Sequence, residues 1–184
     1  ISQLLLQNLD YEDWIDIYLR LVKWDMEFDI HPEVDLRQTL NEQKKECNRA
    51  FSKFVEKNYK YWLKGGTQAK IPLLSPQIVA NYLIPELKNA EGPVFFFVLD
   101  CLRLDQWLLM ESYIKDIFKI KKEYYYSILP TATPYSRNAL FSGLFPSEIE
   151  NLYPDLWKNA KEDENTLNAH EKELLQNQLD RNRI

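Results

Sequence analysis

The chain has 184 residues, of which 45% are hydrophobic and 14% aromatic, and its formal net charge is -5. This length suits one sizeable domain or two small ones, each with a well-packed core. The negative charge argues against a generic nucleic-acid-binding patch, because binding to phosphates requires clustered lysine and arginine.

The two cysteines, Cys47 and Cys101, show no disulfide pattern, which favours a reducing compartment. No stretch approaches the roughly 20 apolar residues of a membrane span, and no signal peptide opens the chain. We therefore expect a cytoplasmic protein. Because helical patterns are under way near Ile1 and near Ile184, we interpret the sequence as a segment of a longer protein.

The first residues are predicted to form two long helices. Residues 1–28 carry one apolar stripe with helical spacing, and a similar pattern covers about residues 33–64. His31-Pro32 separates the two helices, and Gly65-Gly66 ends the second, as expected for glycine just past a helix end. The stripe of the first helix consists of Leu6, Leu9, Trp14, Ile17, Leu21, Trp24 and Phe28.

A third, shorter helix is predicted next. Ser75-Pro76 favours a helix start, and Pro85 breaks or re-initiates the helix. Three helices joined by short turns indicate a helical bundle over residues 1–90, which could serve as a linker, a dimer interface or a signal-transmitting element.

The pattern changes after residue 91. VFFFVL at residues 94–99 is an uninterrupted run of β-branched and aromatic residues and leucine, which predicts a strand buried on both faces, as in a parallel sheet. KEYYYSIL at residues 122–129 predicts a second strand, with helical spacing between the two and a helix at about residues 134–143. Alternating strands and helices indicate an α/β domain over residues 91–184, which ends in a helix at about residues 167–182.

Asp100 directly follows the first predicted strand. This is the sheet edge where open α/β folds bind ligands, so Asp100 is a candidate metal ligand. The alternative is that Asp100 caps the next helix or pairs with Arg103. Asp105 is expected to be structural or to stabilise the helix dipole. Cys101 lacks a histidine base and is expected to pack in the core.

Thr133 also has two interpretations. Before Pro134 it suits a simple helix cap, but a helix N-terminus also favours phosphate and an alkoxide. A threonine hydroxyl is a weak nucleophile unless a base or a metal activates it. Thr131 is the fallback nucleophile. Arg137, about one turn further, could bind substrate phosphate or brace Asp100 or the loop.

The two motifs together resemble the alkaline phosphatase superfamily. These motifs are D-x-x-R-x-D at residues 100–105 and TPYSRNALFSG at residues 133–143. The second motif parallels the sulfatase pattern, except that threonine replaces cysteine and the proline comes one place earlier. LDCLRLDQW and LPTATPYSRNALFSGLFP after a helical bundle resemble the PglZ domain of PorX-type response regulators of Bacteroidetes. The specific resemblance covers about residues 94–150.

This resemblance implies an alkaline-phosphatase-like, doubly wound α/β domain with two zinc ions. Asp100 would ligate a metal, Thr133 would be the metal-bound nucleophile, and the helix start at residues 134–136 would help to hold phosphate. It also implies an upstream receiver domain and sensor kinase, dimerisation on phosphorylation, hydrolysis of oligonucleotide phosphodiesters and control of type IX secretion. A non-enzymatic module that docks a signalling partner is the alternative, and a sulfatase-like enzyme is disfavoured by Thr133.

The family completes its metal pair with later aspartate and histidine residues. This chain has only His31, expected to be a surface or capping residue, and His170, expected to be exposed on a helix. We therefore predict that the segment is inactive by itself. The tyrosines at residues 124–126 are expected to pack in a strand rather than to stack on bases.

Overall fold

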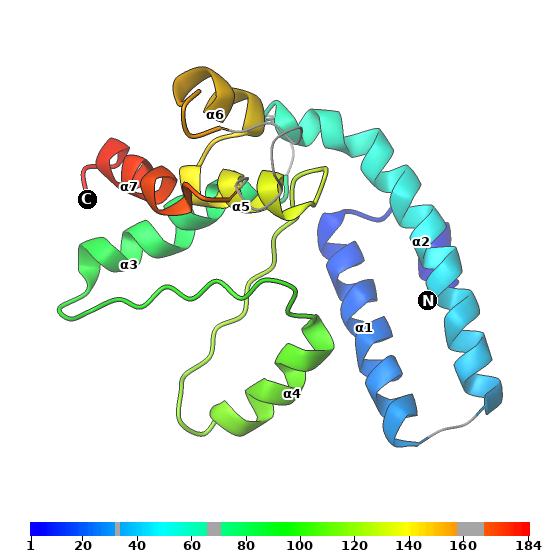
Figure 1. Cartoon of the computed structure of the whole chain (residues 1–184). Coiled ribbons are helices and arrows are strands. Elements are labelled where there is room, and N and C mark those ends of the chain that lie inside the picture. Colours follow the sequence, from blue (N-terminus) through cyan, green and yellow to red (C-terminus); the bar gives the residue numbers. More distant parts are fainter. Residues whose placement is uncertain (32–33, 66–70, 158–167) are drawn as a thin grey trace. The chain divides into compact units, whose positions relative to one another are not determined.

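The computed structural model describes residues 1–31, 34–65, 71–157 and 168–184. All regular secondary structure in these ranges is helical (Figure 1). Pro32, Glu33 and Gly66, which enter the predicted helix boundaries, lie outside the described residues, as do residues 158–167. The elements in chain order are η1 (Leu4–Leu6), α1 (Tyr11–Ile30), α2 (Val34–Leu63), η2 (Ser75–Gln77), η3 (Val79–Leu83), α3 (Ile84–Asn89), α4 (Leu104–Ile114), α5 (Thr133–Ser142), α6 (Pro146–Leu152) and α7 (Glu171–Arg181).

The chain divides into two compact units. Unit 1 comprises Ile1–Pro72 and Leu99–Glu123, and unit 2 comprises Leu73–Val98 and Tyr124–Ile184. The third predicted helix of the N-terminal bundle, which starts at Ser75-Pro76 and corresponds to η2, η3 and α3, therefore belongs to unit 2, while α4 belongs to unit 1. None of the helices in the described ranges is long and apolar enough to cross a membrane.

The predicted doubly wound α/β fold is wrong for this structure. No sheet is present in the described residues, whose strand-like pairing consists of one parallel bridge between Leu74 and Tyr126. An apolar run such as residues 94–99 sets a local preference for extended backbone, but a sheet also needs neighbouring strands that pair with it. Since pairing partners are not encoded in the run itself, its sequence pattern could not establish the sheet.

Residues 94–98 nevertheless show the alternation of an extended chain. Val94 and Val98 pack against the core of unit 2, and the ring of Phe96 meets that of Phe141 edge-on at 6.4 Å. Phe95 and Phe97 point the other way, where they are 74% and 79% exposed and their rings stack at 6.3 Å. The run is therefore covered on one face, and the prediction of a strand buried on both faces is wrong.

The second predicted strand makes a short contact with the start of unit 2. The N–H of Tyr126 donates to the carbonyl of Leu73 at 2.9 Å. The N–H of Ile128 donates to the buried hydroxyl of Ser75 at 3.1 Å. The Ser75 side chain thus takes the place of the next backbone acceptor, which ends the bridge after one pair of residues.

In unit 1, α1 begins at a reciprocal cap rather than at residue 1. The Asp10 carboxylate accepts hydrogen bonds from the N–H groups of Glu12 at 2.8 Å and Asp13 at 3.0 Å. The Asp13 carboxylate in turn accepts from the N–H of Asp10 at 2.8 Å. These contacts satisfy backbone donors that have no partner inside the helix, so they fix its first turn.

The core of unit 1 lies between α1 and α2, which run side by side in opposite directions (Figure 1). The predicted apolar stripe of the first helix is confirmed at Trp14, Ile17 and Leu21, which pack with Leu40 and Cys47 of α2. Leu9 and Phe28 of the stripe also pack against this core, whereas Trp24 is 38% exposed and Leu6 is 88% exposed. α4 also contacts α1.

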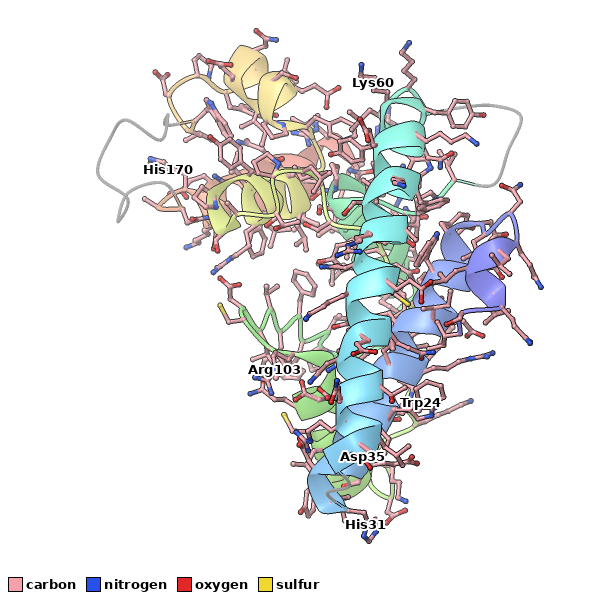
Figure 2. The ribbon with its side chains drawn as sticks, turned by 90° about the vertical axis from the view of Figure 1, so that its right-hand side faces the viewer. Trp24, His31, Asp35, Lys60, Arg103 and His170 are labelled. Atoms are coloured by element: carbon pink, nitrogen blue, oxygen red, sulfur yellow. The ribbon has the colours of Figure 1, made fainter. Side chains whose placement is uncertain are left out.

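The two helices of this pair are also held together by aromatic contacts. The Trp14 ring lies 5.3 Å from Phe51 and 5.9 Å from Phe54, and Phe54 lies 5.6 Å from Trp62 further along α2. Figure 2 shows that His31 lies at the same end of the pair as Asp35, while Lys60 lies at the other end. His31 is exposed at the C-terminal cap of α1, as predicted.

Unit 2 is built around α5, which packs against η2, α6 and α7 (Figure 1). Its core is made by Val79, Leu83, Ile84, Leu140, Phe141, Ile149 and Leu174. α5 ends at Gly143, whose φ of +68° places it in the left-handed region that favours glycine. This central helix carries the residues of the second sequence motif.

Candidate functional site

The start of α5 is formed by backbone contacts rather than by a side-chain cap. Ala132 is the capping residue, and its carbonyl accepts hydrogen bonds from the N–H groups of Tyr135 and Ser136, both at 3.0 Å. Thr133 is the first helical residue, and Pro134 follows it in the first turn. The alternative in which Thr133 is merely the cap is therefore wrong, because the proline is the second residue of the helix and the cap falls on Ala132.

This helix start has few backbone donors left for an anion. Pro134 has no N–H, and the N–H groups of Tyr135 and Ser136 already donate to Ala132. The Ser136 hydroxyl lies 3.2 Å from the carbonyl oxygens of Thr131 and of Ala132, which ties the entry turn to the helix. A phosphate near Thr133 would therefore depend on the helix dipole and on side chains more than on the N–H groups of residues 134–136.

Thr133 and the fallback nucleophile Thr131 have different surroundings. Thr133 is half-buried and lies in the first turn of the helix, where the positive end of the dipole acts on its oxygen. Thr131 is exposed and lies before the helix, and its carbonyl accepts from Ser136. Of the two hydroxyls, that of Thr133 is the one placed to benefit from the helix dipole.

Arg137 binds a residue that the sequence did not indicate. Its Nη2 donates to Oε2 of Glu171, the first residue of α7, at 2.5 Å. Cζ of Arg137 also lies 6.0 Å from the centre of the Phe141 ring. In this structure Arg137 therefore pairs with α7, a partner outside the brace to Asp100 or the loop that the sequence suggested. No sequence pattern could have linked Arg137 to Glu171, because 34 residues separate them.

Asp100 lies in unit 1, in a turn before α4. It is exposed, and its Oδ1 accepts a hydrogen bond from the N–H of Cys101 at 2.9 Å. It does not cap α4, whose capping residue is Arg103. The predicted core packing of Cys101 is also wrong, because the thiol is exposed in this turn, where Cys101 has a φ of +58°. The turn is exposed because the run before it is not part of a buried sheet.

Arg103 and Asp105 form a bidentate pair, in which two guanidinium nitrogens donate to the two carboxylate oxygens. Nε lies 2.9 Å from Oδ1, and Nη2 lies 2.5 Å from Oδ2. Hydrogen bonding to the guanidinium lowers the pKa of Asp105 from 3.8 to about 2 and raises the pKa of Arg103. Asp105 thus lies in the first turn of α4, paired with Arg103.

His170 precedes Glu171 at the cap position of α7 and is half-buried (Figure 2). It therefore lies just outside the helix on which it was expected. It is not as exposed as predicted.

The two principal candidates belong to different compact units, Asp100 to unit 1 and Thr133 to unit 2. Among the described residues, no group of three or more histidine, cysteine, aspartate or glutamate side chains is arranged to hold a metal ion. A zinc site takes about four ligands of these types. The described side chains therefore do not by themselves make up such a ligand set.

Comparison with known families identifies the class of protein. Residues 79–183 match the family described as the BREX system PglZ alkaline phosphatase-like domain, so more than half of the chain is alkaline phosphatase-like. Residues 1–63 match the PorX response regulator linker domain. The chain belongs to the PglZ family, preceded by a PorX-type linker, and the resemblance drawn from the two motifs is confirmed. A search of curated proteins finds no match.

The family boundaries and the compact units differ. The PglZ match contains residues 99–123, yet the contacts of these residues assign them to unit 1, together with the residues of the linker match. Thr133 and Arg137 lie within the PglZ match and within unit 2. Asp100 lies within the PglZ match and within unit 1.

Proposed function

We propose that the chain is part of a zinc-dependent phosphoester hydrolase of the PglZ type that acts within a response regulator. The observation that carries this proposal is the PglZ match over residues 79–183, which contains both sequence motifs. The match to the PorX response regulator linker over residues 1–63 supports the regulatory setting.

Thr133 is the proposed nucleophile. Its hydroxyl stands in the first turn of α5, where the helix dipole favours negative charge on the attacking oxygen and on the phosphate. Bound zinc would supply the activation that a threonine hydroxyl needs at neutral pH, by lowering the pKa of the ligated oxygen. Asp100 is the proposed protein ligand from this part of the chain, and further ligands are required to complete two zinc sites.

The finer assignments rest on the resemblance to PorX-type regulators. We propose that the substrates are oligonucleotide phosphodiesters and that the active form is a phosphorylated homodimer. We also propose that a sensor kinase controls an upstream receiver domain, and that the protein is located in the cytoplasm and controls type IX secretion. A non-enzymatic docking module is the second candidate. The linker match is equally compatible with a hydrolase and with a docking module, so measurements of catalysis must distinguish these two candidates.

The decisive experiment compares Thr133→Ala with Thr131→Ala in the protein that carries this chain. We expect Thr133→Ala to lower the turnover of a model phosphodiester, bis-p-nitrophenyl phosphate, by roughly a thousandfold or more, because it removes the nucleophile. Thr131→Ala is the matched control, since it removes the same hydroxyl two residues earlier, and it should retain turnover. Melting temperatures measured in parallel check that both variants are folded.

Zinc content provides a second, independent measurement. Asp100→Asn removes the carboxylate charge and should lower the zinc bound per chain, as measured by plasma mass spectrometry. Unchanged turnover in Thr133→Ala together with unchanged zinc content in Asp100→Asn would exclude the hydrolase hypothesis and favour the non-enzymatic docking module. Loss of turnover in Thr131→Ala but not in Thr133→Ala would show that Thr131, and not Thr133, is the nucleophile.

A further inference from the structure

Arg137 and Glu171 form a charge pair that joins α5 to α7 inside unit 2. Nη2 of Arg137 donates to Oε2 of Glu171 at 2.5 Å, and Oε1 of the same carboxylate accepts from Nδ2 of Asn168 at 2.9 Å. The Arg137 and Glu171 side chains are 29% and 17% exposed. Because little water surrounds the pair, it is screened less than an ion pair on the surface.

Arg137 is also close to the proposed nucleophile along the helix. It comes four residues after Thr133, and residues at this spacing lie on the same face of a helix, about 6 Å apart along the axis. Side chains of a helix lean toward its N-terminus, a direction that would bring a guanidinium released from Glu171 toward the turn that carries Thr133. A phosphate held at Thr133 would therefore be close to the charge of Arg137.

The acceptor that Arg137 now binds resembles a phosphate in its chemistry. A carboxylate and a phosphate both offer two oxygens to the forked donors of a guanidinium. While the pair is closed, Glu171 neutralises the charge of Arg137 and occupies one of its donors. Glu171 is also the first residue of α7, where the helix dipole favours a carboxylate, and Asn168 holds its other oxygen. The helix dipole and the hydrogen bond from Asn168 together keep the Glu171 carboxylate in place.

We propose that Glu171 is an internal competitor of substrate phosphate for the Arg137 guanidinium and thereby sets the anion affinity of the site. The inference rests on the proposed function, because it requires phosphate to bind beside Thr133. A phosphate that binds there must displace the Glu171 carboxylate or share the guanidinium with it. Glu171 thus lowers the affinity for every phosphate ligand, in contrast to a residue that only supports the fold.

The test is calorimetric titration of the whole protein with inorganic phosphate. Glu171→Gln keeps the shape of the side chain and removes its charge, and we expect it to bind phosphate roughly tenfold more tightly than the unchanged protein, as for a close charge pair. Glu173→Gln is the matched control. It removes the same charge in the same turn of α7, from an exposed residue, and should change the affinity by less than about twofold.

Further variants assign the effect to Arg137. Adding Arg137→Gln to Glu171→Gln should abolish the gain in affinity, because the released guanidinium is then absent. If Glu171→Gln does not fold, Glu171→Asp is the second variant. Its shorter side chain lengthens the contact with Arg137, and it should bind phosphate more tightly than the unchanged protein but by a smaller factor.

Phosphate affinity in Glu171→Gln that equals or falls below that of the unchanged protein would overturn the proposal, and so would the absence of measurable phosphate binding in both proteins. A gain of equal size in Glu173→Gln would overturn it too, because the effect would then be one of net charge. The proposed function fails by a different result, which is undiminished turnover in Thr133→Ala. The two failures can therefore be told apart.

Discussion

Gly143 is the position at which a single methyl group should do the most damage to α5. Its φ of +68° costs an alanine about 1–2 kcal/mol relative to glycine. A Cβ at this position would also lie 2.7 Å from Cδ and 3.2 Å from Cγ of Gln178, and closer still to its Nε2. Gln178 is 2% exposed and cannot move into solvent without opening the contact between α5 and α7.

The two costs can be added because they have different origins. Overpacking of a buried site costs about 1–3 kcal/mol, so we expect Gly143→Ala to lower the free energy of unfolding by about 2–5 kcal/mol in total. Urea denaturation followed by circular dichroism measures this quantity. Unchanged m-values would show that the variants unfold to a similar extent.

Two other glycines separate the backbone term from the steric term. Gly65 has a φ of +62° but has no atom within 4 Å of a Cβ, so Gly65→Ala should cost only the backbone term of about 1–2 kcal/mol. Gly92 has neither feature, and Gly92→Ala should stay within about 0.5 kcal/mol. A cost for Gly143→Ala no larger than that for Gly65→Ala would refute the argument that Gln178 blocks this position.

Two further predictions concern residues on either side of Asp100 in the sequence. Because the pKa of Asp105 is lowered in the folded state, the contribution of this carboxylate to stability is present above pH 3.8 and is lost as the pH falls toward 2. NMR titration of the Asp105 carboxyl should give a midpoint near pH 2, and in Arg103→Gln this midpoint should return toward 3.8. Phe96→Ser should lower the melting temperature more than Phe95→Ser, because Phe96 contacts Phe141 while Phe95 is 74% exposed. Equal effects of the two serine substitutions would contradict the one-sided packing of residues 94–98.

The helices of unit 1 could be predicted because their determinants are local. Trp14, Ile17 and Leu21 recur at the spacing that builds one face of a helix, and the structure buries all three. The start of α1 was placed too early, although Asp10 and Asp13 formed a recognisable signal. An acidic residue followed three positions later by another can form a reciprocal cap, and this one begins the helix at Tyr11.

The extended segments could not be predicted to the same depth. The sequence of residues 94–99 fixes which side chains are apolar, but the number of covered faces depends on what the rest of the chain places beside them. Only the face of Val94, Phe96 and Val98 meets a partner, which is the core of unit 2. Cys101 was expected in the core because no histidine base accompanies it, but it is exposed in the turn that follows this run.

The second motif contains Thr133 and Arg137, and a helix outside the motif holds the second of them. Glu171 of α7 binds Arg137 in the middle of α5. At the C-terminal end of α5, Arg181 of α7 donates to the carbonyl of Ser142 and, at 2.6 Å, to the hydroxyl of Tyr153. Side chains of α7 thus contact α5 at its middle and at its C-terminal end. Since α5 cannot shift along its axis without breaking one of these contacts, substitutions of Glu171 or Arg181 should disturb α5 and the motif that it carries. The motif contains the candidate reactive residues, whereas residues that bind them, such as Glu171, lie elsewhere in the sequence and are brought close by the fold.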